Sequence, residues 1–265
     1  MESVIAQSNE KAADLRALHL PGQPLVVPNA WDAASAQIIE RSGFPAVATS
    51  SNAVAACLGW DDGESAPVQS MLTSALQIAR AVTVPVTIDF ERGYGLEPEE
   101  LVRRFTLTDA VGLNLEDSNP TTGNMIELNE QVNFIRAIRA AAQSIGSDLV
   151  INARTDSFLR GAGSPEEQLV ASIDRGNHYL GAGADCVYPL GAVDPAAIRA
   201  LVQGIDGPIN IARGAESPLT ITELAGLGVA RVTFGPGLQR SVYAWFETQV
   251  LPRLLMDAHA TAPNR

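Results

Sequence analysis

The stretch VPVTIDFERGYGLEPEELVRRFTLTDAVGLNLED, residues 84–117, contains one complete unit of the pattern that decides the fold. A short apolar run at Val84–Ile88 is followed by a helical pattern near residues 97–108 and by a second apolar run at Gly112–Leu115. Short runs rich in Val and Ile are typical of strands in a parallel sheet that is covered by its crossover helices.

The same alternation continues in both directions along the chain. The predicted strands are Leu25–Pro28, Ala46–Thr49, Val84–Ile88, Gly112–Leu115, Leu149–Ala153, Cys186–Pro189, Ile209–Ile211 and Arg231–Phe234. The predicted helices lie near residues 32–42, 69–81, 97–108, 128–144, 165–180, 194–203, 218–226 and 237–250. Eight such units predict an α/β fold of the (β/α)₈ TIM-barrel type. A doubly wound open sheet is the alternative, but the turn Asn29-Ala30-Trp31-Asp32 after the first strand lacks its Gly-x-Gly-x-x-Gly motif.

Composition and charge limit the domain organisation and the partners. The 265 residues are 46% hydrophobic, enough for one large core, and we expect a single barrel domain over residues 1–255 with a short N-terminal helix and a loose tail over 256–265. Acids outnumber bases by 30 to 18 and no basic run occurs, which argues against nucleic acid or a membrane as partner. The N-terminal sequence MESVIAQSNEK does not resemble a signal peptide, so we expect a cytoplasmic protein.

Rare residues exclude several kinds of chemistry. Lys11 is the only lysine and precedes the first strand, which argues against Schiff-base and pyridoxal enzymes. The histidines at positions 19, 178 and 259 are scattered without metal-ligand spacing, and Cys57 and Cys186 suggest no disulfide framework. Acids, arginines, amides and hydroxyls must therefore carry the function.

Polar residues follow most of the predicted strands, and in a barrel these strand ends build the active site. Asp89, Glu91 and Glu116 would repel one another without a cation, so they predict a Mg²⁺ site that could also take Mn²⁺. The alternative is that these acids cap helices or pair with arginines. Arg154 is suited to clamp a substrate carboxylate or phosphonate, although a salt bridge to Glu116 or Asp156 is an alternative that can coexist.

A hydroxyl-rich turn after the second strand and an asparagine on the seventh strand complete the set of predicted substrate-binding residues. Thr49-Ser50-Ser51 follows the second strand and offers amides and hydroxyls to an anion, although ordinary turn chemistry explains such a run equally well. Asn210 lies at the seventh strand. With Arg154, these residues form the predicted contacts to a small anionic substrate.

These segments together resemble the phosphoenolpyruvate mutase/isocitrate lyase superfamily, over about residues 28–244. The resemblance rests on Thr49-Ser50-Ser51, Gly59 to Glu64 (GWDDGE), Asp89 to Gly95 (DFERGYG), Leu115-Glu116-Asp117 and Ala153 to Asp156 (ARTD). It implies a Mg²⁺-dependent barrel acting on small 2-oxo acids or their enols. It also implies that Asp89, Glu91 and Glu116 surround the metal, that Arg154 binds a carboxylate, that Ser50 and Ser51 bind substrate through their amides, and that Asp62 is an acid on a mobile loop.

The sequence departs from the family's lyases in one loop. These lyases carry a Lys-Lys-Cys-Gly/Ser-His loop after the fourth strand, whereas residues 118–124 here read SNPTTGN. Leu190 also stands where many of them have a substrate-binding glutamate. The missing thiol argues against cleavage of isocitrate or methylisocitrate by the usual route.

The resulting hypothesis is a Mg²⁺-dependent lyase or hydrolase that cleaves a C–C bond in a small 2-oxo acid such as oxaloacetate, through an enolate. Asp62, or a water held near Asn119 or Thr121, would transfer the proton. The alternatives are a P–C bond mutase or phosphonopyruvate-type hydrolase, and a non-catalytic 2-oxo-acid-binding barrel. The resemblance further implies a homodimer or homotetramer that exchanges the eighth helix, and the apolar side chains of residues 238–251 fit such an interface.

Overall fold

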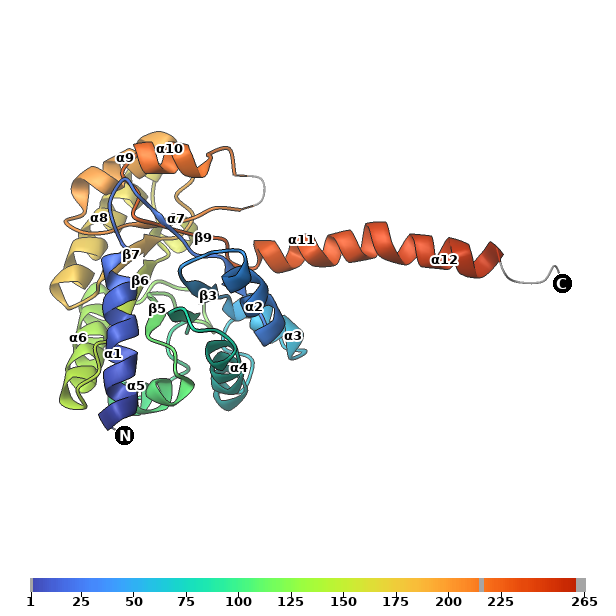
Figure 1. Cartoon of the computed structure of the whole chain (residues 1–265). Coiled ribbons are helices and arrows are strands. Elements are labelled where there is room, and N and C mark those ends of the chain that lie inside the picture. The colour runs from blue at the N-terminus through green and yellow to red at the C-terminus, as the bar shows by residue number, and fades with distance from the viewer. Residues whose placement is uncertain (1, 215–216, 261–265) are drawn as a thin grey trace.

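The computed structural model describes residues 2–214 and 217–260, and the side chains of 6–214 and 217–258. Its parallel strands form a ring that helices surround (Figure 1). The strands are β1 (Leu25–Val26), β2 (Asn29–Ala30), β3 (Val47–Thr49), β4 (Val86–Asp89), β5 (Gly112–Glu116), β6 (Val150–Thr155), β7 (Cys186–Pro189), β8 (Asn210–Ala212) and β9 (Arg231–Thr233).

The ring closes at two places between its sheets. One sheet has the order β2-β3-β4-β5-β6-β7 and the other the order β1-β9-β8. A parallel bridge between Val187 and Ile209 joins β7 to β8, and the chain itself runs from β1 into β2. Since sequential strands are neighbours throughout, the (β/α)₈ barrel is confirmed and the doubly wound alternative is wrong. The predicted first strand covers Leu25–Pro28, but β1 ends at Val26, and Asn29-Ala30, predicted as part of a turn, forms β2. Pro28 between them has no N–H for the ladder.

The helices before residue 205 follow the predicted crossovers, with two short additions. They are α1 (Glu2–Ala17), α2 (Ala33–Arg41), α3 (Ser51–Cys57), α4 (Val68–Arg80), α5 (Pro98–Phe105) with a 3₁₀ turn at Thr106–Thr108, α6 (Leu128–Ser144), α7 (Ser157–Arg160), α8 (Pro165–Gly181) and α9 (Pro195–Gly204). The additions α3 and α7 directly follow β3 and β6, where the sequence predicts only polar turns. Ser50 caps α3 by accepting a hydrogen bond from the Ala53 amide, so the hydroxyl run there begins a helix.

The last helices differ more from the prediction. Helix α10 (Ile221–Gly226) begins three residues later than expected, because Thr220 and Glu223 form the capping box there. Helix α11 (Gly237–Trp245) continues through a π-helical turn (Phe246–Val250) into α12 (Leu251–Ala260). The loose tail predicted from residue 256 is therefore helical as far as 260, and residues 261–265 lie outside the described part. Pro252 has no N–H to donate to Thr248, which accounts for the wider turn.

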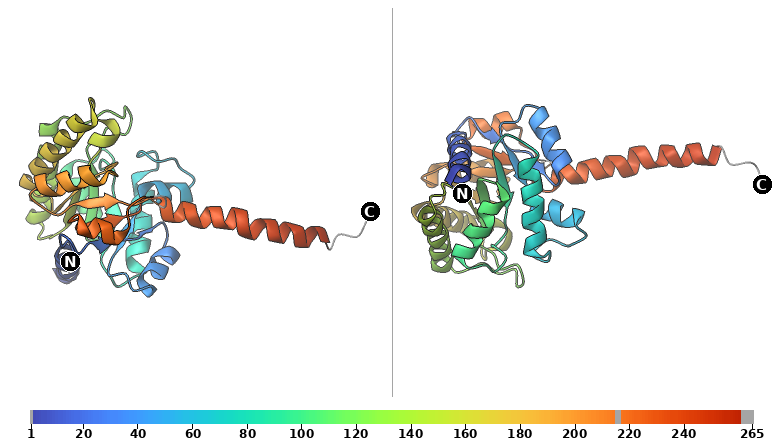
Figure 2. Two further views of the ribbon diagram at one scale, coloured as in Figure 1. Left: turned by 90° about the horizontal axis from the view of Figure 1, so that it is seen from above. Right: turned by 60° about the horizontal axis from the view of Figure 1, so that its bottom comes forward.

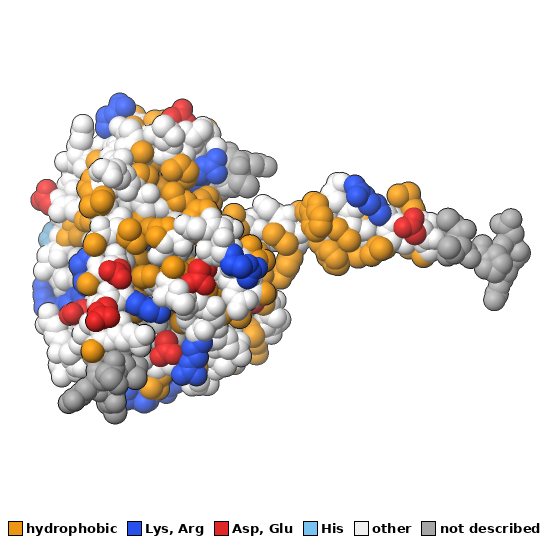
Figure 3. Space-filling model, viewed as in Figure 1, with side chains coloured by type: hydrophobic (Ala, Val, Ile, Leu, Met, Phe, Trp, Pro, Cys, Tyr) orange, Lys and Arg blue, Asp and Glu red, His pale blue; other side chains and the backbone are white. Residues whose placement is uncertain are grey.

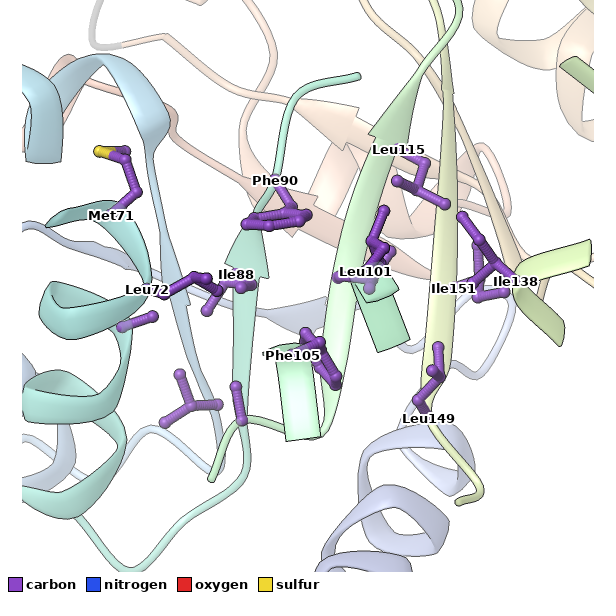
Figure 4. Close-up of a cluster of buried hydrophobic side chains, with 14 of the residues drawn as sticks. Met71, Leu72, Ile88, Phe90, Leu101, Phe105, Leu115, Ile138, Leu149 and Ile151 are labelled. Atoms are coloured by element: carbon purple, nitrogen blue, oxygen red, sulfur yellow. The ribbon is translucent and has the colours of Figure 1, made fainter. Parts of the chain in front are cut away.

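Strand alternation separates an apolar outer face from a polar barrel interior. In β5, Leu113 and Leu115 point outward into the core, while Asn114 and Glu116 point inward. Figure 4 shows the outer layer, in which strand residues such as Ile88 and Ile151 pack against helical side chains such as Leu101. The interior-facing positions of β5 are therefore polar, although its sequence reads as a short, largely apolar run.

The amino ends of the strands are closed by the first helix. Ala12 and Leu15 of α1 are buried in a small cluster with residues of β1, β3 and β6 and with Val111, which directly precedes β5. A Cβ added to Gly112 would lie 2.9 Å from Leu15, so the helix packs tightly on the barrel floor. The helix therefore covers this end of the barrel.

The C-terminal helix leaves the barrel and projects away from it (Figures 1 and 2). Its large apolar side chains are exposed, including Trp245 at 60%, Phe246 at 48% and Leu255 at 61%, and Figure 3 shows hydrophobic side chains along this projection. In the described part of the chain, no helix is both long and apolar enough to cross a membrane.

Candidate active site

Asp89, at the carboxyl end of β4, is held by the neighbouring strands. Its Oδ2 accepts hydrogen bonds from the amide (3.1 Å) and hydroxyl (2.9 Å) of Ser51, and its Oδ1 accepts one from Asn114 Nδ2 at 3.3 Å. The Asp89 amide donates to Thr49 Oγ1 at 3.0 Å. Ser51 and Asn114 thus orient this carboxylate, while Thr49 holds the backbone of Asp89. The substrate contacts predicted for Thr49, Ser50 and Ser51 stay predictions.

Glu91 follows Asp89 on the loop after β4 and is almost fully buried. Its Oε1 accepts a hydrogen bond from the Tyr94 hydroxyl at 2.6 Å, and its Oε2 accepts one from the Glu64 amide at 2.8 Å. Burial, with smaller contributions from the nearby charges of Asp89 and Asp62, raises the pKa of Glu91 to about 7. The carboxylate is therefore fixed in place but poorly neutralised.

Glu116 and Arg154 form a buried ion pair across β5 and β6. Arg154 Nη1 donates to Glu116 Oε2 at 2.6 Å, while its Nε and Nη2 donate to the two oxygens of Asp156 at 2.6 and 2.9 Å. The salt bridge that the sequence left as an alternative for Arg154 is confirmed. Burial is the main cause that raises the pKa of Glu116. The charge of Arg154 lowers this pKa, while the negative charges of Asp156, Asp89 and Glu91 raise it further.

The predicted metal ligands are not assembled as a direct three-carboxylate cluster. Within the described residues, no three His, Cys, Asp or Glu groups converge closely enough to hold a metal ion. The physical reason is that Glu116 turns to Arg154 and Glu91 turns to Tyr94 and Glu64.

The donor set nevertheless fits a hydrated divalent cation. Mg²⁺ usually takes one or two carboxylates directly and keeps several waters. Asp89 raises the pKa of both Glu91 and Glu116, so these carboxylates lie within one another's electrostatic influence. A cation near Asp89 would relieve their repulsion without requiring three direct ligands.

The two predicted proton-transfer residues lie in different surroundings. Asp62 is exposed on the loop after α3, where Asn52 Nδ2 donates to it at 3.3 Å, and its charge reaches Glu91. Asn119 uses its side-chain oxygen within its own loop, accepting from the amides of Thr121 and Thr122 at 2.9 Å each. The structure thus brings Asp62 toward the acids, while the oxygen of Asn119 serves its own turn.

Asn210 lies inside the barrel and is fully buried. Its Oδ1 accepts from the Thr233 hydroxyl at 3.3 Å, and its Nδ2 has no hydrogen-bond partner among the described groups. Its predicted contact with substrate remains a prediction.

Several residues around the site were missed by the sequence analysis. Asp117 supports the region by accepting from the Asp156 amide at 2.8 Å and from the Tyr179 hydroxyl at 2.6 Å. Tyr94 and Glu64 contact Glu91 directly. Both lie in segments that carry the family resemblance, but no spacing rule brings a loop at residue 64 next to one at residue 91.

Comparison with known proteins shows the family to which the chain belongs. The family model described as phosphoenolpyruvate phosphomutase matches residues 15–252. The 2,3-dimethylmalate lyase of Eubacterium barkeri is 31% identical over 229 residues, which cover 82% of this chain and 77% of the lyase.

Solved structures give the same assignment. A phosphonomutase-like protein of Burkholderia cenocepacia J2315 is 42% identical, with a TM-score of 0.87 over 91% of this chain and 99% of that one. Oxaloacetate acetylhydrolase, solved with the inhibitor 3,3-difluorooxalacetate, is 25% identical, with a TM-score of 0.83 over 96% of this chain and 89% of that one. The chain belongs to the phosphoenolpyruvate phosphomutase family, within the phosphoenolpyruvate mutase/isocitrate lyase superfamily.

Proposed function

We propose that this protein is a Mg²⁺-dependent enzyme that cleaves a C–C bond in a small 2-oxo acid such as oxaloacetate, as a lyase or hydrolase. The observation that carries the proposal is that three acids, Asp89, Glu91 and Glu116, lie near one another at one barrel mouth beside Arg154. The names of the 2,3-dimethylmalate lyase and of oxaloacetate acetylhydrolase support this reaction class.

The proposed roles follow from the contacts. Asp89 would hold the cation, with Glu91 and Glu116 stabilising its bound waters. A bound Mg²⁺ would polarise the 2-oxo group and offset the negative charge that develops as the bond at C3 breaks. Thr49 and Ser51 keep Asp89 oriented for this task.

Arg154 would bind a substrate carboxylate. Its Nε and Nη2 are held by Asp156, which fixes the plane of the guanidinium group. Its Nη1 faces Glu116, so a substrate carboxylate would take the place of Glu116 there. Asp62 is the better placed of the two proton-transfer candidates, because its charge already reaches Glu91.

The alternative of P–C bond chemistry has one specific observation in its favour. The phosphonomutase-like protein of Burkholderia cenocepacia shares 42% identity over nearly the whole chain. A phosphonate group could occupy the same cation and Arg154, so the substrate panel below includes phosphonopyruvate.

Assembly and location are part of the proposal. The projecting helix exposes Trp245, Phe246 and Leu255, and we propose that a second copy of the chain covers it in a homodimer or homotetramer. We further propose a cytoplasmic location, and the acidic charge of −12 supports a protein that binds neither nucleic acid nor an anionic membrane.

The test is a panel of oxaloacetate, 2,3-dimethylmalate, 2-methylisocitrate and phosphonopyruvate, assayed with Mg²⁺ and with a chelator. Turnover of oxaloacetate or 2,3-dimethylmalate that is lost on chelation supports the proposal, and 2-methylisocitrate should be a poor substrate. Turnover of phosphonopyruvate alone overturns it in favour of P–C chemistry. Thermal stabilisation by ligands without any turnover overturns it in favour of a binding protein.

A further inference from the structure

Glu64 differs from every other residue of its loop. Of residues 56–65, only Glu64 is not exposed; the others face solvent. Burial raises the pKa of its carboxyl group, although hydrogen bonds from the amides of Tyr94 and Arg92 lower it. An acid that is drawn inward from an exposed loop must be held there by specific contacts.

The contacts join two loops reciprocally. Glu64 Oε1 accepts hydrogen bonds from the amides of Arg92 (3.0 Å) and Tyr94 (2.6 Å), both on the loop after β4. In return, the Glu64 amide donates to Glu91 Oε2 at 2.8 Å. Tyr94 then closes the circuit through its hydroxyl group, which donates to Glu91 Oε1 at 2.6 Å.

The backbone at these positions adopts a conformation that side chains disfavour. Glu64, Glu91 and Tyr94 have φ values of 59°, 48° and 57°, in the left-handed region. Three of the four non-glycine residues with positive φ among the described residues thus lie in this one circuit. Such a conformation persists only where surrounding contacts over-determine it.

We infer that Glu64 is a positioning residue, which locks Glu91 into its place at the barrel mouth and ties the loop bearing Asp62 to the loop after β4. The inference rests on the proposed function, in which Glu91 stabilises the hydrated cation. Because Asp62 lies two residues before Glu64, the same contacts set how far Asp62 can move from the acids. Any displacement of this loop would therefore disturb the orientation of Glu91.

Two variants and a control test the inference. Glu64→Ala removes the acceptor for both amides, whereas Glu64→Gln keeps a side-chain oxygen in nearly the same place. Glu97→Ala is the control, because Glu97 is an exposed acid close by in sequence that makes no side-chain cap hydrogen bond. Tyr94→Phe, which removes only the hydroxyl donor to Glu91, is an independent probe of the same circuit should Glu64→Ala not fold.

The first measurement is amide hydrogen exchange by NMR, which needs neither metal nor substrate. We expect exchange at Arg92 and Tyr94 to accelerate about tenfold or more in Glu64→Ala, because each amide loses a charged acceptor. Exchange should stay within about threefold of wild type in Glu64→Gln and Glu97→Ala. Unchanged exchange of the Arg92 and Tyr94 amides in Glu64→Ala would overturn the inference that Glu64 holds the two loops together.

The second measurement is the affinity for Mn²⁺ alone, followed by paramagnetic resonance, together with steady-state kinetics. We expect Glu64→Ala and Tyr94→Phe to weaken Mn²⁺ binding and to lower kcat, each about tenfold, with KM changed less than about threefold. Faster exchange with unchanged Mn²⁺ affinity and kcat would show a merely structural contact and overturn the positioning role. A wild-type protein without Mn²⁺ binding or turnover would instead overturn the proposed function, while the exchange data would still decide whether the lock exists.

Discussion

The barrel mouth and the projecting C-terminal helix differ in whether their side chains find partners within this chain. At the mouth, each charged group finds a partner within the same chain, as Arg154 does with Glu116 and Asp156. On the helix, Trp245 and Phe246 are about half or more exposed. The difference fits the proposal that one chain supplies the charged groups of the site, while a second copy of the chain covers the exposed helix.

The largest effect is expected at the mouth. Asp89→Asn keeps the size of the side chain but removes the charge that we propose holds the cation. We expect kcat/KM to fall at least about a hundredfold, since metal electrostatics supply several kcal/mol at developing charge. Steady-state assays with Mg²⁺ measure this, and a melting curve near that of wild type would show that the fold is intact.

The control for this variant is Asp174→Asn, on the outer helix α8, where the acid is 57% exposed and lies next to His178. It should leave turnover within about twofold of wild type. Should Asp89→Asn retain the Mg²⁺-dependent activity of the control, Asp89 does not hold the cation.

The helix provides the second test of the contrast. The double substitution Trp245→Ala and Phe246→Ala should weaken self-association at least about thirtyfold, because buried aromatic anchors typically contribute 2 kcal/mol or more to an interface. Light scattering across a dilution series measures the association constant. Val170→Ala, an equally exposed apolar site on α8 (67%), is the matched control and should have no effect. A monomeric wild-type protein at micromolar concentration would exclude the exchanged helix.

The pH dependence of cation binding sharpens the assignment of Glu91. Its folded pKa is raised to about 7, so below that pH a bound cation must displace a proton. The affinity for Mg²⁺ should therefore rise with pH as Glu91 loses its proton, and it should level off only above about pH 8, because the pKa of Glu116 is raised to about 8. Without the cation, the same shift makes the free energy of unfolding decrease as the pH rises from 4.5 toward 7.

Calorimetry in buffers of different ionisation enthalpy would detect the released proton directly. A Mg²⁺ affinity that is constant from pH 5.5 to 8.5 would show that Glu91 does not sense the cation.

The smallest effect is expected from the cysteines. Cys186 is fully buried on β7, and burial raises its pKa to about 12, while Cys57 lies on α3 with its sulfur 3.4 Å from the Tyr243 hydroxyl. Neither lies on the loop after β5, so the Cys57→Ser, Cys186→Ala variant should keep turnover within about threefold of wild type. A hundredfold loss of turnover in a variant that melts normally would make a thiol catalytic.

Local patterns in the sequence were sufficient to predict the barrel. The alternation of apolar runs and helices located all eight strand positions within a few residues, because burial on the helical side imposes a period that can be read locally. The same alternation placed Asp89, Glu116 and Arg154 at the mouth, since carboxyl ends of parallel strands share one end. The short helices α3 and α7 were missed because seven and four residues carry too little periodicity.

The partners of the site residues could not be predicted in the same way. Whether Arg154 faces substrate or Glu116 depends on side-chain directions across two strands, and the sequence left both open. The contact of Glu64 with the loop after β4 spans 28 residues and has no local signal.

The sequence by itself therefore determined the barrel, the acidic mouth and the membership of the family, because these depend on strand period and on short motifs. Only the tertiary structure decided that Asp89 is oriented by Thr49 and Ser51, that Glu91 is held by Glu64 and Tyr94, and that the acids do not converge as three direct metal ligands. The physical reason is that hydrogen bonds between loops depend on distances that the closed barrel sets, and no local pattern of residues encodes those distances.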